Sequence, residues 1–385
     1  SVSTGTGAIT NLTFTDGASF DNMLLNVAGD AIFIQSDDGA NTMLIGSAIS
    51  GENAGDDGID LNSDGGMITV DISAAGSFAE AGQNDATGDG IDINNNNGGV
   101  ILLDLDTAAG IADFSGAAQN GLLSISQDTM GVGGILTTVN FNDGADLSDV
   151  GFDAIGISSG DGADTNVTGR NMVGTMAGSD AIELFATDTG SMIDIDFTGT
   201  NDFSDALNNG IVSNNFSGGN IDVNIGNADF SETVPMSGRL TGDGLFSNAD
   251  GTGTSSTFTF NTGAMFNNAG FDAIDLETSD GASNTLLGAN LSGTMAGDTG
   301  IEIFNTGASD STTTVTLTGT NDFSDAGVVG ILSINSAGDV TVSIGDANFS
   351  GAGTIGIGSA AVGDTADSMF TFNTGANFDD AGDAA

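Results

Sequence analysis

Carboxylates are the side chains in this sequence that could do chemistry. The 385 residues include 53 Asp and Glu but only two Lys and Arg, with no His and no Cys, and the formal net charge is −51. The missing residue types exclude disulfides, Cys/His metal sites, cysteine nucleophiles and histidine-based triads. Nucleic acid is also excluded as a partner, because phosphate contacts depend on Lys and Arg. What remains is the chemistry of oxygen ligands for cations and of carboxylates acting as acids or bases.

Six carboxylates recur at equivalent points of a repeated pattern. Four follow a recurring Ile directly, and two stand at a turn just before it. They are Asp60, Asp92, Asp275 and Glu302 in the first group and Asp57 and Asp89 in the second. Consecutive repeats bring Asp60 beside Asp92 and Asp275 beside Glu302, where like charges repel. Hard oxygen ligands suit Ca²⁺, so we expect a cation-dependent protein with Ca²⁺ as the candidate ion and no other cofactor.

Two other interpretations of the acidity stay open. Carboxylates on a surface can simply splay into water and keep an edge-bearing β protein soluble. They can also reflect adaptation to high salt.

The elements that position these carboxylates are repeats of about 30 residues. One series is an Ile or Leu that follows Gly or Ala, usually after an Asp or Asn. Its members are Ile32, Ile59, Ile91, Leu122, Ile155, Ile182, Ile211, Leu245, Ile274, Ile301, Ile331 and Ile357. A second series of apolar residues runs just upstream with the same period. It contains Phe20, Ile49, Phe78, Phe114, Leu147, Met172, Phe203, Phe230, Phe266, Leu291, Phe323, Phe349 and Phe378, and we expect its phenylalanines to form a core ladder.

A longer period lies over the short one. The segment 197–206 reads FTGTNDFSDA and the segment 317–326 reads LTGTNDFSDA, while 141–155 and 260–274 are also alike. These matches predict super-repeats of four coils each, at about 14–140, 141–259 and 260–371, with a partial fourth copy at 372–385.

The segments between turn signals alternate apolar and polar residues with a period of two, which indicates short strands. One repeat of this size cannot bury its apolar face alone, but a stack of repeats can. We therefore predict an all-β parallel β-helix of about 12–13 coils, forming a single solenoid domain over 1–385. Parallel crossovers are usually right-handed, so this hand is expected. A row of small β-sandwiches is the rival architecture, and the short internal period disfavours it.

The segments GDGIDINNNNGGVILLDL (88–105) and NNGIVSNNFSGGNIDVNIG (208–226) are similar to repeats of bacterial secreted parallel β-helix proteins. That group includes autotransporter passenger domains and large surface adhesins. The resemblance implies export, an extracellular location at the bacterial cell surface, and a role in a surface structure or filament. The chain departs from calcium-binding nonapeptide repeats, because GDGIDI (88–93) does not recur every nine residues.

These observations favour a structural or adhesive protein that is not an enzyme. Parallel β-helices also host polysaccharide lyases and hydrolases, but the chain has no Trp or Tyr for a sugar platform and too few basic residues for a lyase. An ice-binding solenoid is a further alternative, although no continuous rank of Thr is present. No apolar run is long enough to span a membrane. Both ends interrupt the repeat without an evident cap, so we expect head-to-tail self-assembly into a filament.

Overall fold

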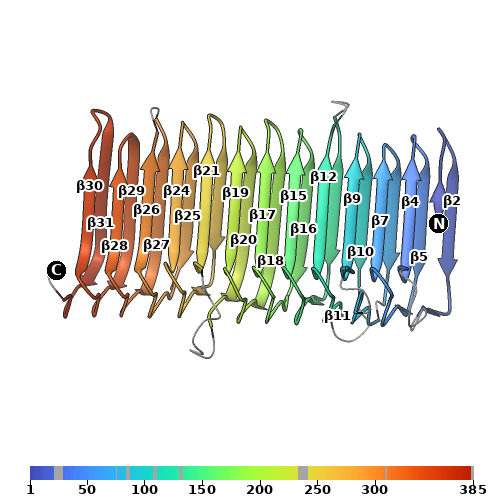
Figure 1. The fold of residues 1–385 in the computed structure, drawn as a ribbon, viewed down its shortest axis with the longest axis horizontal. Helices are drawn as coiled ribbons and strands as arrows, with labels where there is room; N and C mark the ends of the chain where they lie inside the picture. The colour runs from blue at the N-terminus through green and yellow to red at the C-terminus, as the bar shows by residue number, and fades with distance from the viewer. Residues whose placement is uncertain are drawn as a thin grey trace. The chain divides into compact units, whose positions relative to one another are not determined.

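The computed structural model describes residues 1–20, 29–74, 76–83, 87–106, 111–129, 133–232, 242–307 and 310–382. Within these ranges the chain is all-β, without a helix, and winds into a parallel β-solenoid of about 12 turns with about 29 residues in each coil (Figure 1). The prediction of the fold class is therefore confirmed. None of these residues belongs to a helix long and apolar enough to cross a membrane.

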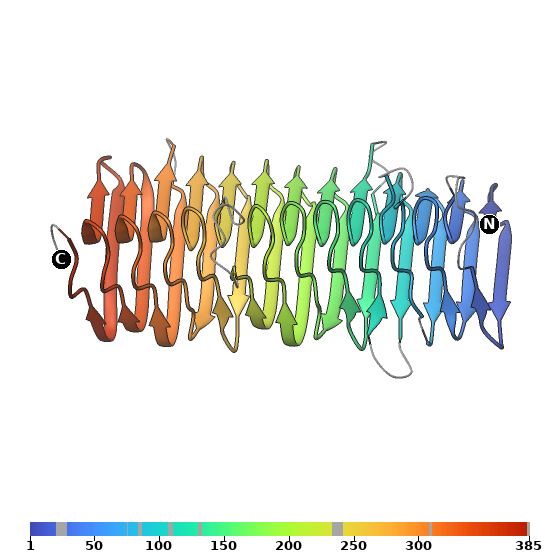
Figure 2. The ribbon, with the colours of Figure 1, turned by 60° about the horizontal axis from the view of Figure 1, so that its bottom comes forward.

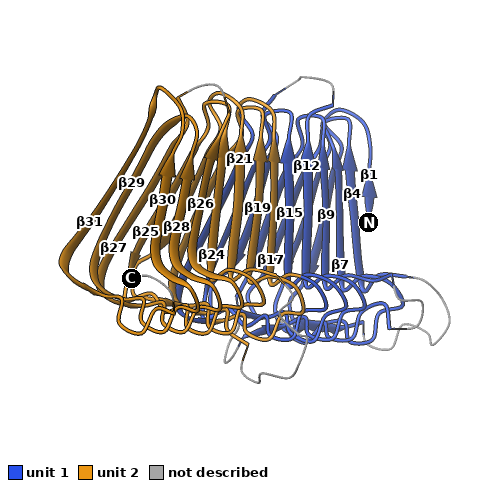
Figure 3. Ribbon diagram, turned by 60° about the vertical axis from the view of Figure 1, so that its left-hand side comes forward, with its two compact units in different colours: residues 1–179, 190–201 blue, residues 180–189, 202–385 orange. Residues whose placement is uncertain are grey.

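The chain divides into two compact units, coloured separately in Figure 3. Unit 1 contains residues 1–179 and 190–201, and unit 2 contains residues 180–189 and 202–385. The single solenoid domain, its hand and the boundaries of the super-repeats stay predictions.

Unit 1 has two stacked parallel sheets and two short strand pairs. Its first sheet is β1 (Val2–Ser3), β4 (Ile32–Asp37), β7 (Ile59–Asp64), β9 (Ile91–Asn96), β12 (Leu122–Gln127) and β15 (Ile155–Gly160). Its second sheet is β2 (Ile9–Phe14), β5 (Asn41–Gly46), β8 (Met67–Ile72), β10 (Val100–Leu105), β13 (Leu136–Phe141), β16 (Asp164–Arg170) and β18 (Met192–Asp202, of which 192–201 belong here). The short pairs are β3 (Ala18–Ser19) with β6 (Ile49–Ser50), and β11 (Ala112–Asp113) with β14 (Ala145–Asp146).

Unit 2 repeats this arrangement. Its first sheet is β17 (Ile182–Thr187), β19 (Ile211–Phe216), β21 (Leu245–Asp250), β24 (Ile274–Ser279), β26 (Thr299–Thr306), β28 (Val329–Asn335) and β30 (Ile355–Ala361). Its second sheet is β20 (Asn220–Asp229), β22 (Ser255–Phe260), β25 (Ser283–Ala289), β27 (Thr312–Asp322), β29 (Gly338–Asn348) and β31 (Ala366–Asn377), with the short β23 (Ala264–Met265) beside β20.

The register between coils stacks like residues on like. In unit 1, Ile59 pairs with Ile91 and Ile91 with Leu122; in unit 2, Ile274 pairs with Ile301. Alternate residues of each strand face inward, so β9 buries Ile91 and Ile93 while the residues between them are half-buried. The first apolar series is thus a continuous inner column in each unit, and it fixes where its flanking carboxylates lie.

The phenylalanines of the second series form stacked columns beside this inner column. Their corner segments follow the same course from coil to coil within each unit (Figure 2). In unit 2, the Phe230 ring lies 5.5 Å from Phe203 and 5.4 Å from Phe266, at interplanar angles of 8°. Seven ladder rings are fully buried, and they are Phe78, Phe114, Phe203, Phe230, Phe266, Phe323 and Phe349. Phe20 and Phe378 are half-buried.

Three members of the second series do not belong to the column of rings. In each case the residue in line with the column stands two positions later in the sequence. The bridges of Ser292 to Met265 and to Asp322 place Gly293, and not Leu291, in line with Phe323. A Cβ at Gly293 would lie 2.8 Å from Phe323 Cδ1, so the glycine leaves room for the ring. Leu291 instead fills the space at Gly288, which occupies the position that Phe260 has one coil earlier.

The same exchange occurs in unit 1. Ile49 lies between Gly46 and Gly51, and Met172 between Gly169 and Gly174. Side-chain atoms of Ile49 and Met172 would meet a Cβ at Gly46 and Gly169. The motif Gly-x-x-apolar-x-Gly therefore moves one large side chain from the corner of the coil to the end of its strand.

Replacing Phe230 by Ala should lower the free energy of unfolding by about 3–5 kcal/mol, because the ring is fully buried and stacked on both sides. Urea denaturation measures the loss, and hydrogen exchange shows whether it is confined to neighbouring coils. Phe152→Ala is the control, since that ring is 52% exposed. Equal losses in the two variants would contradict the stacked core.

Candidate functional site

A ladder of Asp and Asn side chains stands two residues before the first apolar series. In unit 1 its members are Asp30, Asp57, Asp89, Asn120 and Asp153; in unit 2 they are Asp180, Asn209, Asp243, Asp272 and Thr299. In most steps a side-chain oxygen accepts the backbone N–H of the equivalent residue in the next coil. The N–H of Asp89 donates to Asp57 Oδ1 at 2.7 Å, and the N–H of Thr299 donates to Asp272 Oδ1 at 2.7 Å.

This ladder uses carboxylates as backbone caps. Each corner must turn, so the N–H of the ladder residue needs an acceptor other than a strand partner, and an oxygen one coil away supplies it. The cost is that carboxylates of neighbouring coils approach each other in a partly dry corner.

Asparagine interrupts the runs of carboxylates. Asn120 Nδ2 donates to Asp89 Oδ1 at 2.9 Å, and Asn209 Nδ2 donates to Asp180 Oδ1 at 2.7 Å. Asn209 Oδ1 in turn accepts the N–H of Asp243 at 2.7 Å. An amide can accept like a carboxylate and also donate to the carboxylate before it, so it continues the ladder without adding charge.

Two clusters form where the ladder meets further acids in the following strands. In unit 1, Asp57, Asp60 and Asp92 have carboxylate oxygens within 4.8 Å of one another, and Asp60 pairs directly with Asp92 in the register of β7 and β9. Burial raises the pKa of Asp57 to about 8, and it raises the pKa of Asp60 and of Asp92 to about 7. Neighbouring negative charges raise these pKa values further.

In unit 2, Asp272, Asp275 and Glu302 satisfy the same 4.8 Å limit, and Asp275 pairs with Glu302 between β24 and β26. Burial raises the pKa of Asp275 to about 9 and that of Glu302 to about 7. The proximity of the Asp272 carboxylate also raises the pKa of Glu302.

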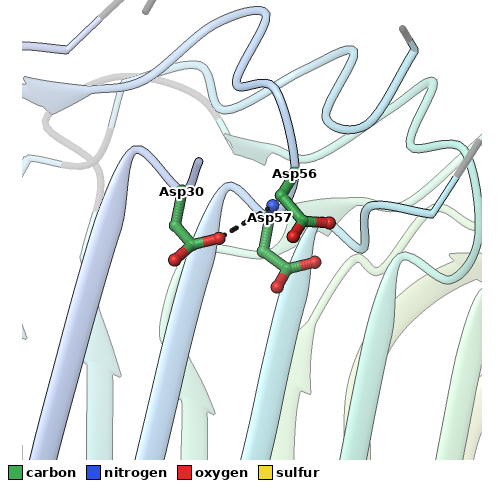
Figure 4. Close-up of side chains that lie close together, drawn as sticks. All are labelled: Asp30, Asp56 and Asp57. Carbon is green, nitrogen blue, oxygen red and sulfur yellow. Dashed lines mark hydrogen bonds between the residues drawn. The ribbon is translucent and has the colours of Figure 1, made fainter. Parts of the chain in front are cut away.

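A third group contains Asp30, Asp56 and Asp57. Figure 4 shows Asp30 in one coil and the other two in the next, with the N–H of Asp57 donating to Asp30 Oδ1 at 3.3 Å. Burial raises the pKa of Asp30, although Asp30 and Asp56 are both partly open to solvent.

The sequence therefore identified most of the clustered acids. Asp57, Asp60 and Asp92 lie together, and so do Asp275 and Glu302. Asp89 lies outside these groups of three, and its Oδ1 accepts both the N–H and the Nδ2 of Asn120. Sequence reasoning missed Asp272, although it stands before Ile274 as Asp57 stands before Ile59, and that shared offset was the available signal.

A separate acidic groove lies in unit 1 over the corner segments. It has a volume of about 460 Å³, and the carboxylates in its lining are Glu52, Glu80, Asp113 and Asp149. Asp113 is held in place because its Oδ1 accepts from Ser115 Oγ at 2.7 Å and its Oδ2 accepts from Ser77 Oγ at 3.1 Å. The groove brings solvent-accessible carboxylates together without a basic side chain in its lining.

Searches against models of known protein families and against curated proteins find no match. Among solved structures, the fold is similar to the catalytic unit of a thermostable GH87 α-1,3-glucanase from Streptomyces thermodiastaticus strain HF3-3. The TM-score is 0.38 at 12% identity, and the alignment covers 98% of this chain and 64% of the glucanase unit. The chain thus spans less than two thirds of the structure that it matches.

The prediction that the chain is not an enzyme is corrected, since the solved structure with a similar fold is a catalytic unit, and this likeness by itself assigns no activity to the chain. The prediction was based on missing residue types. Their absence does not exclude catalysis, because carboxylates alone can catalyse some reactions. Two carboxylates are enough for glycoside hydrolysis, and one must keep a raised pKa to act as the acid. Buried acids with raised pKa values occur here in both units.

Changing Asn209 to Asp should destabilise the fold by about 1–3 kcal/mol, because a donor to Asp180 is replaced by a third like charge beside Asp243. Asn220→Asp adds the same charge at an exposed position and is the control. The urea midpoints of the two variants, measured at neutral pH in the presence of a chelator, give both changes in stability. A loss no larger than that of the control would contradict the role given to the amide.

Raising the pH should destabilise the cation-free protein. The pKa of Asp275, about 9 when folded, lies above its unfolded value near 4, so the folded chain holds a proton that the unfolded chain has released. Its contribution to stability is complete below about pH 4 and is lost as the pH rises through 9. Urea midpoints in chelator should therefore fall between pH 5 and 9, and less steeply in Asp275→Asn than in Glu183→Gln, which lies at an exposed equivalent position. Parallel slopes would contradict this.

Proposed function

We propose that this chain is an extracellular structural or adhesive β-solenoid, a segment of a bacterial surface filament or matrix fibre. The observation that supports the proposal best is the one-to-one register of successive coils in each unit. Each coil is joined to the next by two parallel sheets, and many coils are joined also by stacked phenylalanines or by the Asp/Asn ladder. Contacts between successive coils that recur along the whole chain are what an extended structural element needs.

The acidity fits the same role. A net charge of −51 with two basic residues makes neighbouring chains repel side to side. Contacts along the coil direction are different, because in-register parallel pairing can join the edge strands of two chains as it joins two coils of one chain. Repulsion between sides combined with pairing between edges favours linear, head-to-tail assembly.

Electron microscopy and sedimentation velocity of the chain over a range of concentrations test this assembly. We expect linear particles whose length grows with protein concentration, and whose formation is favoured by salt that screens repulsion between chains. A chain that remains a discrete particle of one size at all concentrations and salt levels would contradict assembly. Antibody labelling of intact and lysed cells tests the location, and labelling of lysed cells alone would contradict it.

The acidic groove of unit 1 favours a second candidate, the hydrolysis of a neutral polysaccharide. Its carboxylates are the residue type that supplies the acid and the base in such a reaction, and its charge disfavours anionic sugars. Release of reducing ends from neutral glucans, measured for the wild type and Asp113→Asn, tests it. Activity that Asp113→Asn loses and Glu183→Gln keeps would support a hydrolase. No release, or equal release by Asp113→Asn, would contradict it.

A further inference from the structure

The clusters Asp57/Asp60/Asp92 and Asp272/Asp275/Glu302 are built on one pattern. Each combines the ladder residue two before the recurring Ile, the residue one after it, and the residue one after the Ile of the next coil. The register pairs Asp60 with Asp92 and Asp275 with Glu302 in the same way. The same three positions therefore carry acids in two coils that belong to different units.

The second cluster contains a carboxylate with an unsatisfied oxygen. Asp275 is only 8% exposed, and its Oδ1 is buried without a hydrogen-bond donor. In the first cluster, Asp92 is half-buried, but its Oδ1 is buried without a donor while its Oδ2 accepts from Asn94 Nδ2 at 3.0 Å. Burying a carboxylate oxygen without a partner is costly, so an oxygen of this kind points to a bound cation.

Arg170 is the only basic side chain among the described residues, and it belongs to neither cluster. Arg239 lies outside the described residues. The charges around Asp275 are all negative and come from Asp243, Asp272, Glu277 and Glu302. The described part of the chain offers these acids no basic side chain, which leaves room for a bound cation as the source of counter-charge.

We propose that each of these two clusters binds one Ca²⁺ ion. Ca²⁺ takes six to eight oxygens at about 2.3–2.6 Å, so two of its ligands can lie up to about 5 Å apart, and the oxygens of each cluster lie within 4.8 Å of one another. Three carboxylates supply up to six oxygens. Mg²⁺ suits these sites less well, because it demands near-ideal octahedral geometry at about 2.0–2.1 Å and usually keeps several waters.

The third acidic group, around Asp30 and Asp56, does not share these properties. Its only buried member, Asp57, already belongs to the first cluster, and no oxygen of the three is buried without a donor. The inference is confined to the two equivalent clusters, and it holds whether the chain is a fibre segment or an enzyme.

Equilibrium dialysis of the full chain against radioactive Ca²⁺ tests the proposal, in physiological salt with millimolar Mg²⁺ to suppress weak surface binding. We expect two tightly bound ions per chain. Asp275→Asn should lose one of them, Asp92→Asn the other, and the double variant both. Glu183→Gln removes a charge at the equivalent position outside both clusters and should retain two.

Thermal unfolding separates binding from a purely structural effect. Asn keeps the shape of Asp275 but cannot ionise, so Asp275→Asn should melt no lower than the wild type in chelator but gain less from Ca²⁺. The proposal is overturned if the wild type binds no Ca²⁺ above the level of the double variant, or if Asp275→Asn keeps both ions. It is overturned equally if the melting temperature of the wild type is unchanged by Ca²⁺ at constant ionic strength.

Discussion

Residues at equivalent positions of successive coils lie directly beside one another, so each side chain must be compatible with the one that the register pairs with it. Parallel strands in one-to-one register place paired residues about 4.8 Å apart, and the strands that carry the recurring Ile and its flanking acids pair without an offset that would separate them. For Ile and Phe this constraint is favourable, because apolar side chains and offset rings stack well. For carboxylates, the same stacking brings like charges together and is unfavourable. Whether stacking is favourable or unfavourable therefore limits which residue types can recur at each position of the coil.

The acids show how the chain manages the costly case. Outward-facing carboxylates are hydrated and need no partner in the chain, as at Glu183. At the corner, the ladder oxygens are needed to accept backbone N–H groups, so charge is diluted by Asn120 and Asn209, which serve the same acceptor role. Among the described residues, acids also follow the recurring Ile in consecutive coils at Asp60 and Asp92 and at Asp275 and Glu302. These are the places where the proposed cation would contribute most.

The fold could be predicted from the sequence because it depends on period alone. The Ile series set the register, and pairs such as Ile59 with Ile91 follow from spacing without further information. The clusters were predictable in part, since Asp60 and Asp92 lie one residue past that series. Asp272 has the same offset from Ile274 that Asp57 has from Ile59, but its approach to Asp275 and Glu302 depends on the path of the corner, which the offset alone does not describe. Leu291 was misplaced for a related reason: spacing does not show that Gly288 and Gly293 exchange the position of one large side chain.

The glycines of the corner give the solenoid a unit of length larger than the coil. Gly51, Gly174 and Gly293 each break an aromatic column, and the positions between them repeat in the order glycine, Phe, Phe, and Phe or Leu. A coil with glycine at this position makes room for the phenylalanine ring of the next coil, so single coils are not interchangeable. Blocks of four coils are interchangeable, because each block begins with the glycine coil and the block before it ends with a coil that has Phe or Leu at this position. A gene for such a chain can therefore lengthen or shorten by whole blocks while every interface between coils stays one that already exists.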